Sequence, residues 1–439
     1  MVKNIVCKFG GTSLACSKNI SQVASIVKKA KNRFVVVSAP GKRNSEDIKL
    51  TDCLINAFGA SSQNKDFEPF FNVFKQRFEE IKKELNVTKL DLTKYYTQLY
   101  EALKKHKDYD YVVSRGEFFS ALVISNYLGY EFLDAADFIT FDKSGNVELK
   151  VTKQKFDNFV EKNKCYVIPG FYGKTLKGKI KTFSRGGSDV TGAIVAVLAG
   201  CEVYENWTDV DGFLAADPKI CKGPELISEL SYHELRELSY MGANVLHPDC
   251  VRFLRENNII LNLRNTFNPA CKGSLIMPDL KKVSHKKLTG IAGQKGFTII
   301  HVEKFDINES LGIIEKIANI FKKYNVSIEH IPTGIDSVSI IVKSHFINEA
   351  NKQNLLDDIY RQIKPDRLEV MQEVSLISVV GTKLKQDRLA EKQVFDSLFK
   401  TDAKLITLNK GAGGISIIFG VPESQFETTM QSLYNSLFK

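Results

Sequence analysis

The hexapeptide Lys8-Phe9-Gly10-Gly11-Thr12-Ser13 directly follows a short apolar run at residues 5–7. A second glycine turn, Ser184-Arg185-Gly186-Gly187-Ser188-Asp189, leads into small and apolar residues at 190–199. Each stretch has the order of a strand, a tight glycine turn and a helix. Such a turn presents backbone N–H groups and the positive end of a helix to an anion. Together the two turns predict a site that holds phosphate and a charged small molecule.

The composition is that of an ordinary globular protein, with 439 residues, 43% of them hydrophobic and 26% charged. This length favours two or three domains. The net charge of +10 comes from basic residues spread along the chain, so nucleic-acid binding is not expected. Eight widely spaced cysteines indicate reduced thiols rather than a zinc site. With no signal peptide or membrane-spanning run recognised, we expect a cytoplasmic protein that does not bind membranes.

Residues 1–280 alternate short apolar runs with helix-like segments. Strands are expected at residues 3–9, 34–38, 165–169, 202–207 and 259–262, and helices at 19–30, 118–128, 189–199 and 232–240. Continuous apolar strands are typical of a sheet that is buried on both faces. The alternation predicts a three-layer α/β domain with a mostly parallel sheet. Ligands bind such sheets at the carboxyl ends of the strands, where both glycine turns would lie.

An internal duplication follows. Residues 281–374 read as strand, helix, strand, strand, helix, strand, the βαββαβ order of a ferredoxin-like unit. Residues 375–439 repeat this order but lack one strand. The nearest unassigned strand is 288–292, so we expect it to complete the second unit, with the first copy inserted. Pairing of 288–292 inside the preceding domain would contradict this interpretation.

Five motifs occur in the order seen in aspartate kinases. They are Lys8 to Ser13, Ser114-Arg115-Gly116-Glu117, Arg185 to Asp189, Trp207-Thr208-Asp209-Val210-Asp211-Gly212, and Val245-Leu246-His247-Pro248. The chain resembles that family over essentially its whole length, and its duplicated tail resembles the paired ACT regulatory domains. The resemblance implies transfer of phosphate from ATP to the β-carboxylate of L-aspartate, the first step toward lysine, threonine and methionine. It also implies Mg²⁺ held as MgATP without a separate metal site, and a homodimer or homotetramer formed through the ACT domains.

The chemistry of this reaction suits the residues present. A carboxylate nucleophile has a pKa of about 4 and needs no general base, only positioning and neutralisation of charge on the phosphoryl group. Lys8 is the expected phosphate ligand. A surface lysine at a strand end would be the alternative, which the following glycines disfavour. The N–H groups of Gly10 and Gly11 and the hydroxyl of Ser13 would line the phosphate path.

Aspartate has two further charged groups that an enzyme can bind, its α-carboxylate and its ammonium group. Arg185 could hold the carboxylate, and Glu117 could pair with the ammonium or stabilise the start of a helix at residue 118. Asp189 is either an ordinary acid of a first helical turn or an organiser of Lys8 and the metal-bound phosphates, and the resemblance favours the second role. The resemblance adds further substrate contacts at Ser38, Thr51, Gly186, Gly187 and Ser188.

Nucleotide and effector residues follow from the resemblance. The ATP set is Lys8, Gly10, Gly11, Ser13, Thr208, Asp209, Leu214, Lys219, Asn244 and Val245. Of these, Leu214, Lys219 and Asn244 differ from the residues common in relatives. This leaves the details of the adenine pocket open. An allosteric amino acid is expected, with lysine preferred over threonine. The effector set is Asn308, Ser310, Leu311, Ser327, Ile328 and Glu329. The alternation of Ser327 and Glu329 fits the solvent face of a strand equally well.

Two other functions stay open. Another amino-acid kinase, acting on glutamate or N-acetylglutamate, would share the fold and the glycine turns. A free α-amino group that fits Glu117, together with the ACT pair, favours aspartate. A non-catalytic amino-acid sensor with a decayed kinase domain is the other possibility, against which the intact Lys8, Arg185 and Asp189 argue.

Overall fold

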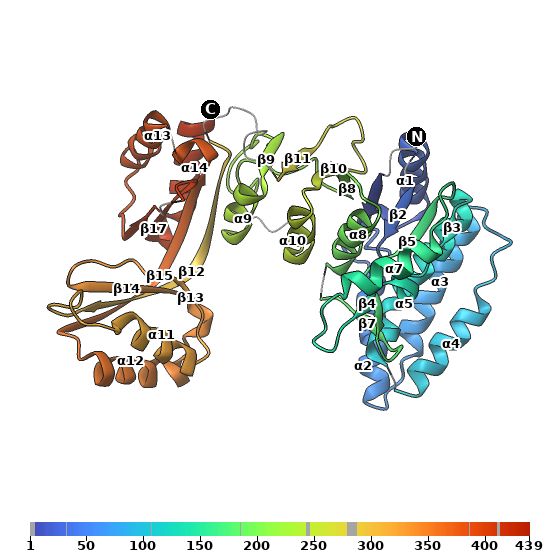
Figure 1. Cartoon of the computed structure of the whole chain (residues 1–439), viewed down its shortest axis with the longest axis horizontal. Coiled ribbons are helices and arrows are strands. Elements are labelled where there is room, and N and C mark those ends of the chain that lie inside the picture. The colour runs from blue at the N-terminus through green and yellow to red at the C-terminus, as the bar shows by residue number, and fades with distance from the viewer. Residues whose placement is uncertain are drawn as a thin grey trace. The chain divides into compact units, whose positions relative to one another are not determined.

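The computed structural model describes residues 5–31, 33–106, 108–184, 186–242, 246–278, 288–385, 387–410 and 413–439. The chain forms two compact units, and each is described by itself (Figure 1). The first unit comprises residues 1–213, 226–232 and 245–284, and the second comprises 214–225, 233–244 and 285–439. Segments 214–225 and 233–244, which the sequence analysis placed in the first domain, therefore cluster with the C-terminal residues.

The first unit is built on an eight-stranded sheet with the order β3-β5-β2-β1-β8-β10-β11-β9. Its strands are β1 (Val6–Phe9), β2 (Phe34–Val37), β3 (Glu131–Phe132), β5 (Tyr166–Pro169), β8 (Val203–Thr208), β9 (Glu229–Ser231), β10 (Ile260–Asn265) and β11 (Ser274–Met277). Only β10 and β11 pair antiparallel; the other neighbours are parallel. The mostly parallel sheet predicted from the apolar runs is confirmed.

Helices cover both faces of this sheet (Figure 1). One layer contains α1 (Ser17–Ala30), α2 (Leu50–Ser62), α3 (Glu68–Glu84), α4 (Thr93–Lys104) and α5 (Tyr109–Leu128). These helices share a core cluster with Cys7 and Phe9 of β1. Successive strand residues face opposite sides, so Lys8 points to the other layer. That layer contains α7 (Leu149–Phe159), α8 (Gly187–Leu198) and α10 (Pro248–Glu256).

Smaller elements complete the first unit. Along the chain, α6 (Ala135–Phe138) follows α5 and precedes α8. The same part of the chain forms a three-stranded sheet of β4 (Thr140–Phe141), β6 (Tyr172–Thr175) and β7 (Ile180–Thr182). No helix in the described part of the chain is long and apolar enough to cross a membrane.

The second unit contains one six-stranded antiparallel sheet with the order β13-β14-β12-β15-β17-β16. Its strands are β12 (Gly290–Glu303), β13 (Ile328–His330), β14 (Ser337–Lys343), β15 (Arg367–Val380), β16 (Thr407–Asn409) and β17 (Ser416–Pro422). Its helices include α11 (Ile313–Lys323), α12 (Glu349–Ile363), α13 (Arg388–Phe399) and α14 (Phe426–Phe438).

Strands β12 and β15 each run through both copies of the duplication, where the sequence had suggested separate strands. The first part of β12 pairs with the second copy, as in Gly290 with Val380, and its last part pairs with the first copy. This pairing supports our proposal that strand 288–292 completes the unit of residues 375–439. Local kinks hid the continuity, because Gly296 (φ +89°) and Glu373 (φ +56°) interrupt the strand alternation.

Helix α9 (Tyr232–Tyr240) joins both copies within the second unit. Its fully buried Glu234 accepts hydrogen bonds from Thr289 Oγ1 (2.6 Å) and from the N–H of Thr382 (2.9 Å). At the other end of α9, the Tyr240 hydroxyl donates to the carboxylate of Glu329, which lies in β13 of the first copy. Residues 233–240 therefore bind strand β13 at one end and residues that flank β12 and β15 at the other.

Two glycines in helix interiors give a matched test of packing. A Cβ on Gly192 of α8 would lie 2.4 Å from the hydroxyl of buried Tyr204, whereas a Cβ on Gly59 of α2 would meet nothing within 4 Å. Gly192→Ala should therefore lower the free energy of unfolding by about 1–3 kcal/mol. Gly59→Ala should raise it by about 0.5–1 kcal/mol, because alanine favours helices. Urea unfolding followed by circular dichroism measures both, and equal effects would contradict the packing.

Candidate functional site

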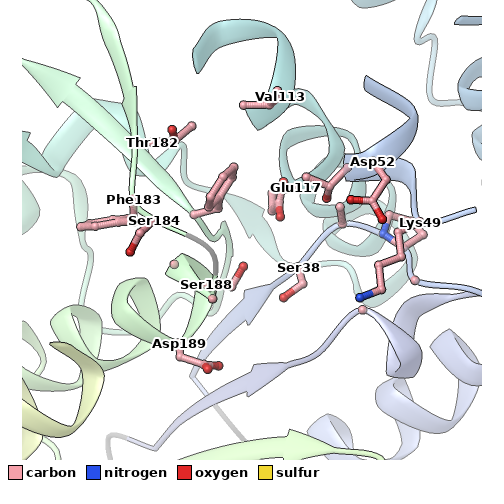
Figure 2. A pocket seen from close by; sticks show the side chains of 18 of the residues that line it. Ser38, Lys49, Asp52, Val113, Glu117, Thr182, Phe183, Ser184, Ser188 and Asp189 are labelled. Carbon is pink, nitrogen blue, oxygen red and sulfur yellow. The ribbon is translucent and has the colours of Figure 1, made fainter. Parts of the chain in front are cut away.

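A cavity of about 570 Å³ lies in the first unit, where β1, β2, α5 and α8 meet (Figure 2). It brings together many of the residues singled out from the sequence. Those that line it are Lys8, Gly11, Ser38, Thr51, Glu117, Gly186, Gly187, Ser188 and Asp189. They come from segments far apart in the chain, so the two glycine turns share one cavity.

A buried ion pair joins the two turns. Lys8 Nζ lies 2.6 Å from Asp189 Oδ1, and the two side chains are 10% and 11% exposed. Asn206, which is the register partner of Lys8 on β8, donates to the same carboxylate oxygen at 3.0 Å. The pair places a carboxylate beside the buried ammonium, and it leaves N–H donors of Lys8 for a further anion.

The first glycine turn approaches the neighbouring loop very closely. A Cβ on Gly11 would lie 2.9 Å from the carbonyl oxygen of Ala39, so a larger residue would push the two segments apart. Gly10 and Ser13 differ from their expected roles. The Gly10 N–H donates to the Trp207 carbonyl (3.0 Å), and the buried Ser13 hydroxyl bonds to Thr266 Oγ1 (2.7 Å). Neither residue is among those that line the cavity.

The second glycine turn forms the start of α8. Gly186 has φ +85°, a left-handed conformation that favours glycine. Arg185 lies outside the described residues, but its neighbours Ser184 and Gly186 line the cavity. Ser184 Oγ bonds to His247 Nε2 at 2.7 Å, and His247 Nδ1 accepts from the Asp249 N–H at the start of α10. His247 thus links the second glycine turn to the start of α10.

Glu117 is the most unusual acid of the cavity. It is only 5% exposed, and burial raises the pKa of its carboxyl to about 8, although the Ala39 N–H and the nearby cations Arg115 and Lys8 oppose the shift. Its Oε2 has no hydrogen-bond partner among the described residues. Helix α5 begins at Tyr109, so the alternative in which Glu117 stabilises a helix start at residue 118 is wrong.

Several lining residues carried no recognisable motif. They are Lys49, Asp52, Tyr109, Val113, Phe171 and Thr182, some of them visible in Figure 2. For Lys49 and Asp52, the sequence signal that could have predicted a place in the cavity was their closeness to Thr51. Lys49 lies two residues before Thr51, and Asp52 directly follows it. The aromatic and loop residues reach the cavity only through the tertiary fold.

The expected nucleotide residues that follow the glycine turns are divided between the two units. Thr208 at the end of β8 and the exposed Asp209 belong to the first unit, and the Thr208 hydroxyl bonds to Asp209 (3.2 Å). Leu214 and Lys219 belong to the second unit. These four do not line the cavity of about 570 Å³. Asn244 and Val245 lie outside the described residues.

A second cavity, of about 470 Å³, lies in the first copy of the duplication. Its lining includes Ser327 and Ile328 of the expected effector set, together with Ala318, Phe321, Lys322, Asn325, Val326 and Phe346. Asn308, Ser310 and Leu311 are not part of this lining, and Leu311 is 97% exposed. Glu329 is also absent from it and instead accepts the hydrogen bond from Tyr240.

Comparison with known proteins places these features in a family. The model of the amino acid kinase family matches residues 3–265. Aspartokinase 3 of Bacillus subtilis is 30% identical over 99% of this chain and 98% of its own. Chloroplastic aspartokinase 1 of Arabidopsis thaliana is 27% identical over 100% of this chain and 81% of its own.

Solved structures agree. The aspartate kinase of Clostridium acetobutylicum has a TM-score of 0.92 and 38% identity, covering 99% of this chain and 100% of its own. Aspartokinase III of E. coli, in complex with lysine and aspartate, shares the fold at a TM-score of 0.76 and 22% identity, covering 99% and 100% of the two chains. The chain therefore belongs to the amino acid kinase family, among its aspartokinases.

Proposed function

We propose that this protein is an aspartate kinase, which phosphorylates the β-carboxylate of L-aspartate with ATP. The observation that carries the proposal is the single cavity in which the Lys8–Asp189 pair meets the buried Glu117. A carboxylate oxygen attacks the γ-phosphorus, the bond from that phosphorus to the β,γ-bridging oxygen breaks, and ADP leaves with the electron pair. The products are ADP and 4-phospho-L-aspartate.

Lys8 is suited to the phosphoryl group. Its carboxylate partner sets its position in advance, so little reorganisation is needed when the negative phosphate oxygens arrive. The nucleophile is already ionised, and a general base is unnecessary. The protein's contribution is to place two anions in line and to offset their repulsion.

Glu117 is suited to the ammonium group of aspartate. Its Oε2 is without a partner in the described structure, and a positive charge beside it would favour the ionised carboxylate. The acylated nitrogen of N-acetylglutamate carries no such charge, which favours a free amino acid as substrate. Arg185 for the α-carboxylate, and Ser38, Thr51 and Ser188 as further contacts, complete the proposed substrate site.

Mg²⁺ fits the chemistry of this cavity. The carboxylates of Asp52 and Asp189 and the hydroxyls of Ser38 and Ser188 line it, and Mg²⁺ prefers such oxygen ligands, often through water. When bound with ATP, the ion neutralises phosphate charge. Asp189 would hold Lys8 in place while it faces the metal–phosphate complex.

Regulation belongs to the same proposal. We place an amino-acid effector, lysine before threonine, in the cavity that contains Ser327 and Ile328. Its apolar wall of Phe321, Val326 and Phe346 suits an aliphatic stem, and Lys322 suits a carboxylate. The E. coli enzyme, whose solved structure contains lysine and aspartate, has the same fold.

We also propose a homodimer or homotetramer that forms through the ACT domains. The eight free cysteines favour a cytoplasmic location for the protein.

The function is tested by incubating the purified protein with MgATP, L-aspartate and hydroxylamine. We expect aspartyl hydroxamate and ADP in equal amounts, and no hydroxamate with N-acetyl-L-glutamate.

Lys8→Ala should lower kcat about 10²- to 10³-fold, the typical cost of removing one preorganised electrostatic ligand. Circular dichroism checks that this variant is folded. Product from glutamate alone would assign a different kinase, and near-normal turnover of Lys8→Ala would exclude the phosphate role of Lys8.

The pKa of Glu117 predicts a pH dependence. Only the ionised carboxylate can pair with the substrate ammonium, and with a pKa of about 8 the ionised fraction rises about fivefold between pH 7 and pH 8. The kcat/KM for aspartate should therefore rise about fivefold over this interval. In Glu117→Gln, the kcat/KM for aspartate should be low and should not change with pH. The KM for ATP should show neither this pH dependence nor this loss. Initial rates at low aspartate concentration measure this, and an unchanged pH profile in the variant would remove Glu117 from substrate binding.

Ser327→Phe should weaken inhibition by lysine, because the larger side chain fills the effector cavity. The lysine concentration for half-inhibition should rise about tenfold or more, with the uninhibited rate unchanged. Leu408→Ala, at the corresponding strand β16 of the second copy, is the control and should leave lysine sensitivity as it is. Unaltered inhibition of Ser327→Phe would place the effector elsewhere.

A further inference from the structure

The active-site cavity contains a cation that the proposed mechanism does not use. Among the described residues that line it, the positive side chains are Lys8 and Lys49. Lys8 is paired with Asp189, whereas Lys49 makes no ion pair within the described part of the chain. Figure 2 shows the Lys49 side chain pointing into the space that Ser38 also faces. Lys49 thus offers an unpaired ammonium group to an anion in this cavity.

The position of Lys49 is set by the loop that leads into α2. Lys49 has an extended backbone and immediately precedes Leu50, the first residue of that helix. The loop is held at its base, where the Gly41 N–H donates to the Gly11 carbonyl (2.8 Å), and the Leu50 N–H donates to the Pro40 carbonyl (3.1 Å). Lys49 therefore starts from a fixed backbone although its side chain is exposed.

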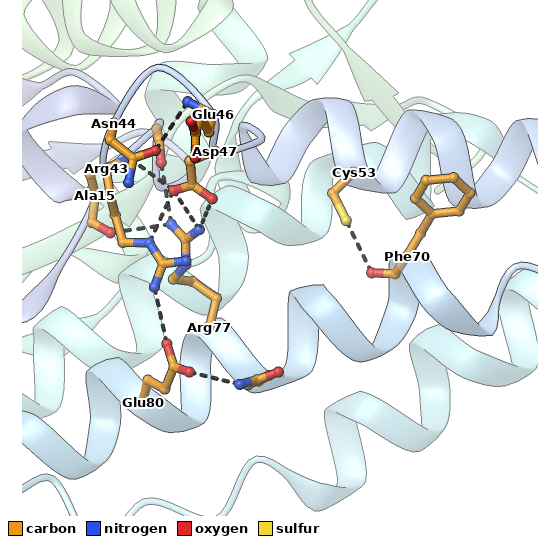
Figure 3. A network of polar contacts seen from close by, with 11 residues as sticks. Ala15, Arg43, Asn44, Glu46, Asp47, Cys53, Phe70, Arg77 and Glu80 are labelled. Atoms are coloured by element: carbon orange, nitrogen blue, oxygen red, sulfur yellow. Dashed lines mark hydrogen bonds and ion pairs between the residues drawn. The ribbon is translucent and has the colours of Figure 1, made fainter.

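A buried arginine holds the middle of the loop (Figure 3). Arg77 of α3 is 3% exposed, and its Nη2 donates to both carboxylate oxygens of Asp47, at 2.5 and 2.7 Å. Its Nη1 reaches the carbonyl oxygens of Ala15 and Gly41 at 3.4 Å. A buried guanidinium depends strongly on its partner, because removal of that partner leaves an uncompensated charge. The Arg77–Asp47 pair therefore ties the loop to the helical layer, two residues before Lys49.

Asp47 is held as a carboxylate from a second side as well. The N–H and Nε of Arg43 donate to Asp47 Oδ2 at 2.8 and 3.0 Å. Burial by itself would raise the pKa of Asp47, but these bonds and those from Arg77 outweigh it and keep that pKa well below its usual range. The Asp47 carboxylate is thus ionised at any pH at which the enzyme would be assayed.

The charges of the substrate show where Lys49 fits. In the proposed site, Lys8 serves the phosphates, Arg185 the α-carboxylate and Glu117 the ammonium. The β-carboxylate, which must approach the negative phosphate, has no cation assigned to it. Lys49 lies two residues before the proposed substrate contact Thr51, and both line the cavity.

We propose that Lys49 binds the β-carboxylate of L-aspartate, and that Asp47 and Arg77 position Lys49 for this contact. The inference rests on the proposed function. The ammonium of Lys49 draws the nucleophile toward the γ-phosphate and offsets the repulsion between the two anions. No proton moves in this role.

Lys49→Ala tests the contact, with Lys42→Ala as the matched control on the same loop. Lys42 is exposed and does not line the cavity. Loss of a charge-assisted hydrogen bond should raise the KM for aspartate about ten- to a hundredfold, with the KM for MgATP changed by less than about twofold. Lys49→Arg, which keeps the charge, should recover most of the loss, and Lys42→Ala should behave as wild type. A normal aspartate KM in Lys49→Ala, or a rise in the KM for MgATP instead, would overturn the assignment.

Asp47→Asn tests the positioning role through a double-mutant comparison. Alone it should raise the KM for aspartate in the same direction as Lys49→Ala. Added to Lys49→Ala it should have little further effect, because it acts through the lysine. An equal factor in both backgrounds would show that Asp47 acts independently, whatever its effect on stability, which urea unfolding reports separately.

The wild-type enzyme in the same hydroxamate assay separates this inference from the function on which it rests. If the wild type forms no aspartyl hydroxamate, the proposed function fails. If the wild type turns over and Lys49→Ala matches Lys42→Ala, only the role of Lys49 fails.

Discussion

The buried ion pair between Lys8 and Asp189 is the constraint on which the rest of the active site depends. It joins β1 to the first turn of α8, so the two glycine turns have to meet at one cavity. Asn206 supports the carboxylate from the neighbouring strand. Removal of either partner would leave the other as an uncompensated buried charge. The pair also aims the positive end of α8 at the region where anions are expected.

The balance of charge in the cavity follows from this pair. Lys8 and Asp189 nearly cancel, so the remaining ionisable groups decide which ligands the cavity favours. Glu117 is mostly uncharged near neutral pH when no ammonium is beside it, since burial raises its pKa to about 8. Entry of an amino acid would convert it to a carboxylate and release a proton. The site thus becomes more polar as it fills, which suits a substrate that carries both signs of charge.

The sequence was informative where the signal is local. The apolar run before Lys8, the glycines of both turns and the acid at Asp189 reveal strand, turn and helix within a few residues of each other. Features that depend on distant contacts were missed or incomplete. The Gly10 N–H and the Ser13 hydroxyl are taken by Trp207 and Thr266. The proposed role of Lys49 in the cavity depends on a loop that Arg77 holds through Asp47, and no sequence motif predicts that contact. Likewise, β12 and β15 each continue from one copy of the duplication into the other, which no local pattern encodes.

Helix α9 has a consequence for any attempt to separate the two halves of the protein. Its Glu234, Leu235 and Leu238 are buried, and the Glu234 carboxylate is held by groups that follow residue 285, Thr289 and Thr382. A chain truncated after residue 285 would keep the acid and both leucines but lose these two hydrogen-bond donors. The shortened protein would expose these two leucines beside an acid that has lost its hydrogen-bond donors. An exposed apolar surface of this kind is prone to aggregation. The residues after 285 are thus also a folding partner for helix α9, which precedes them in the chain.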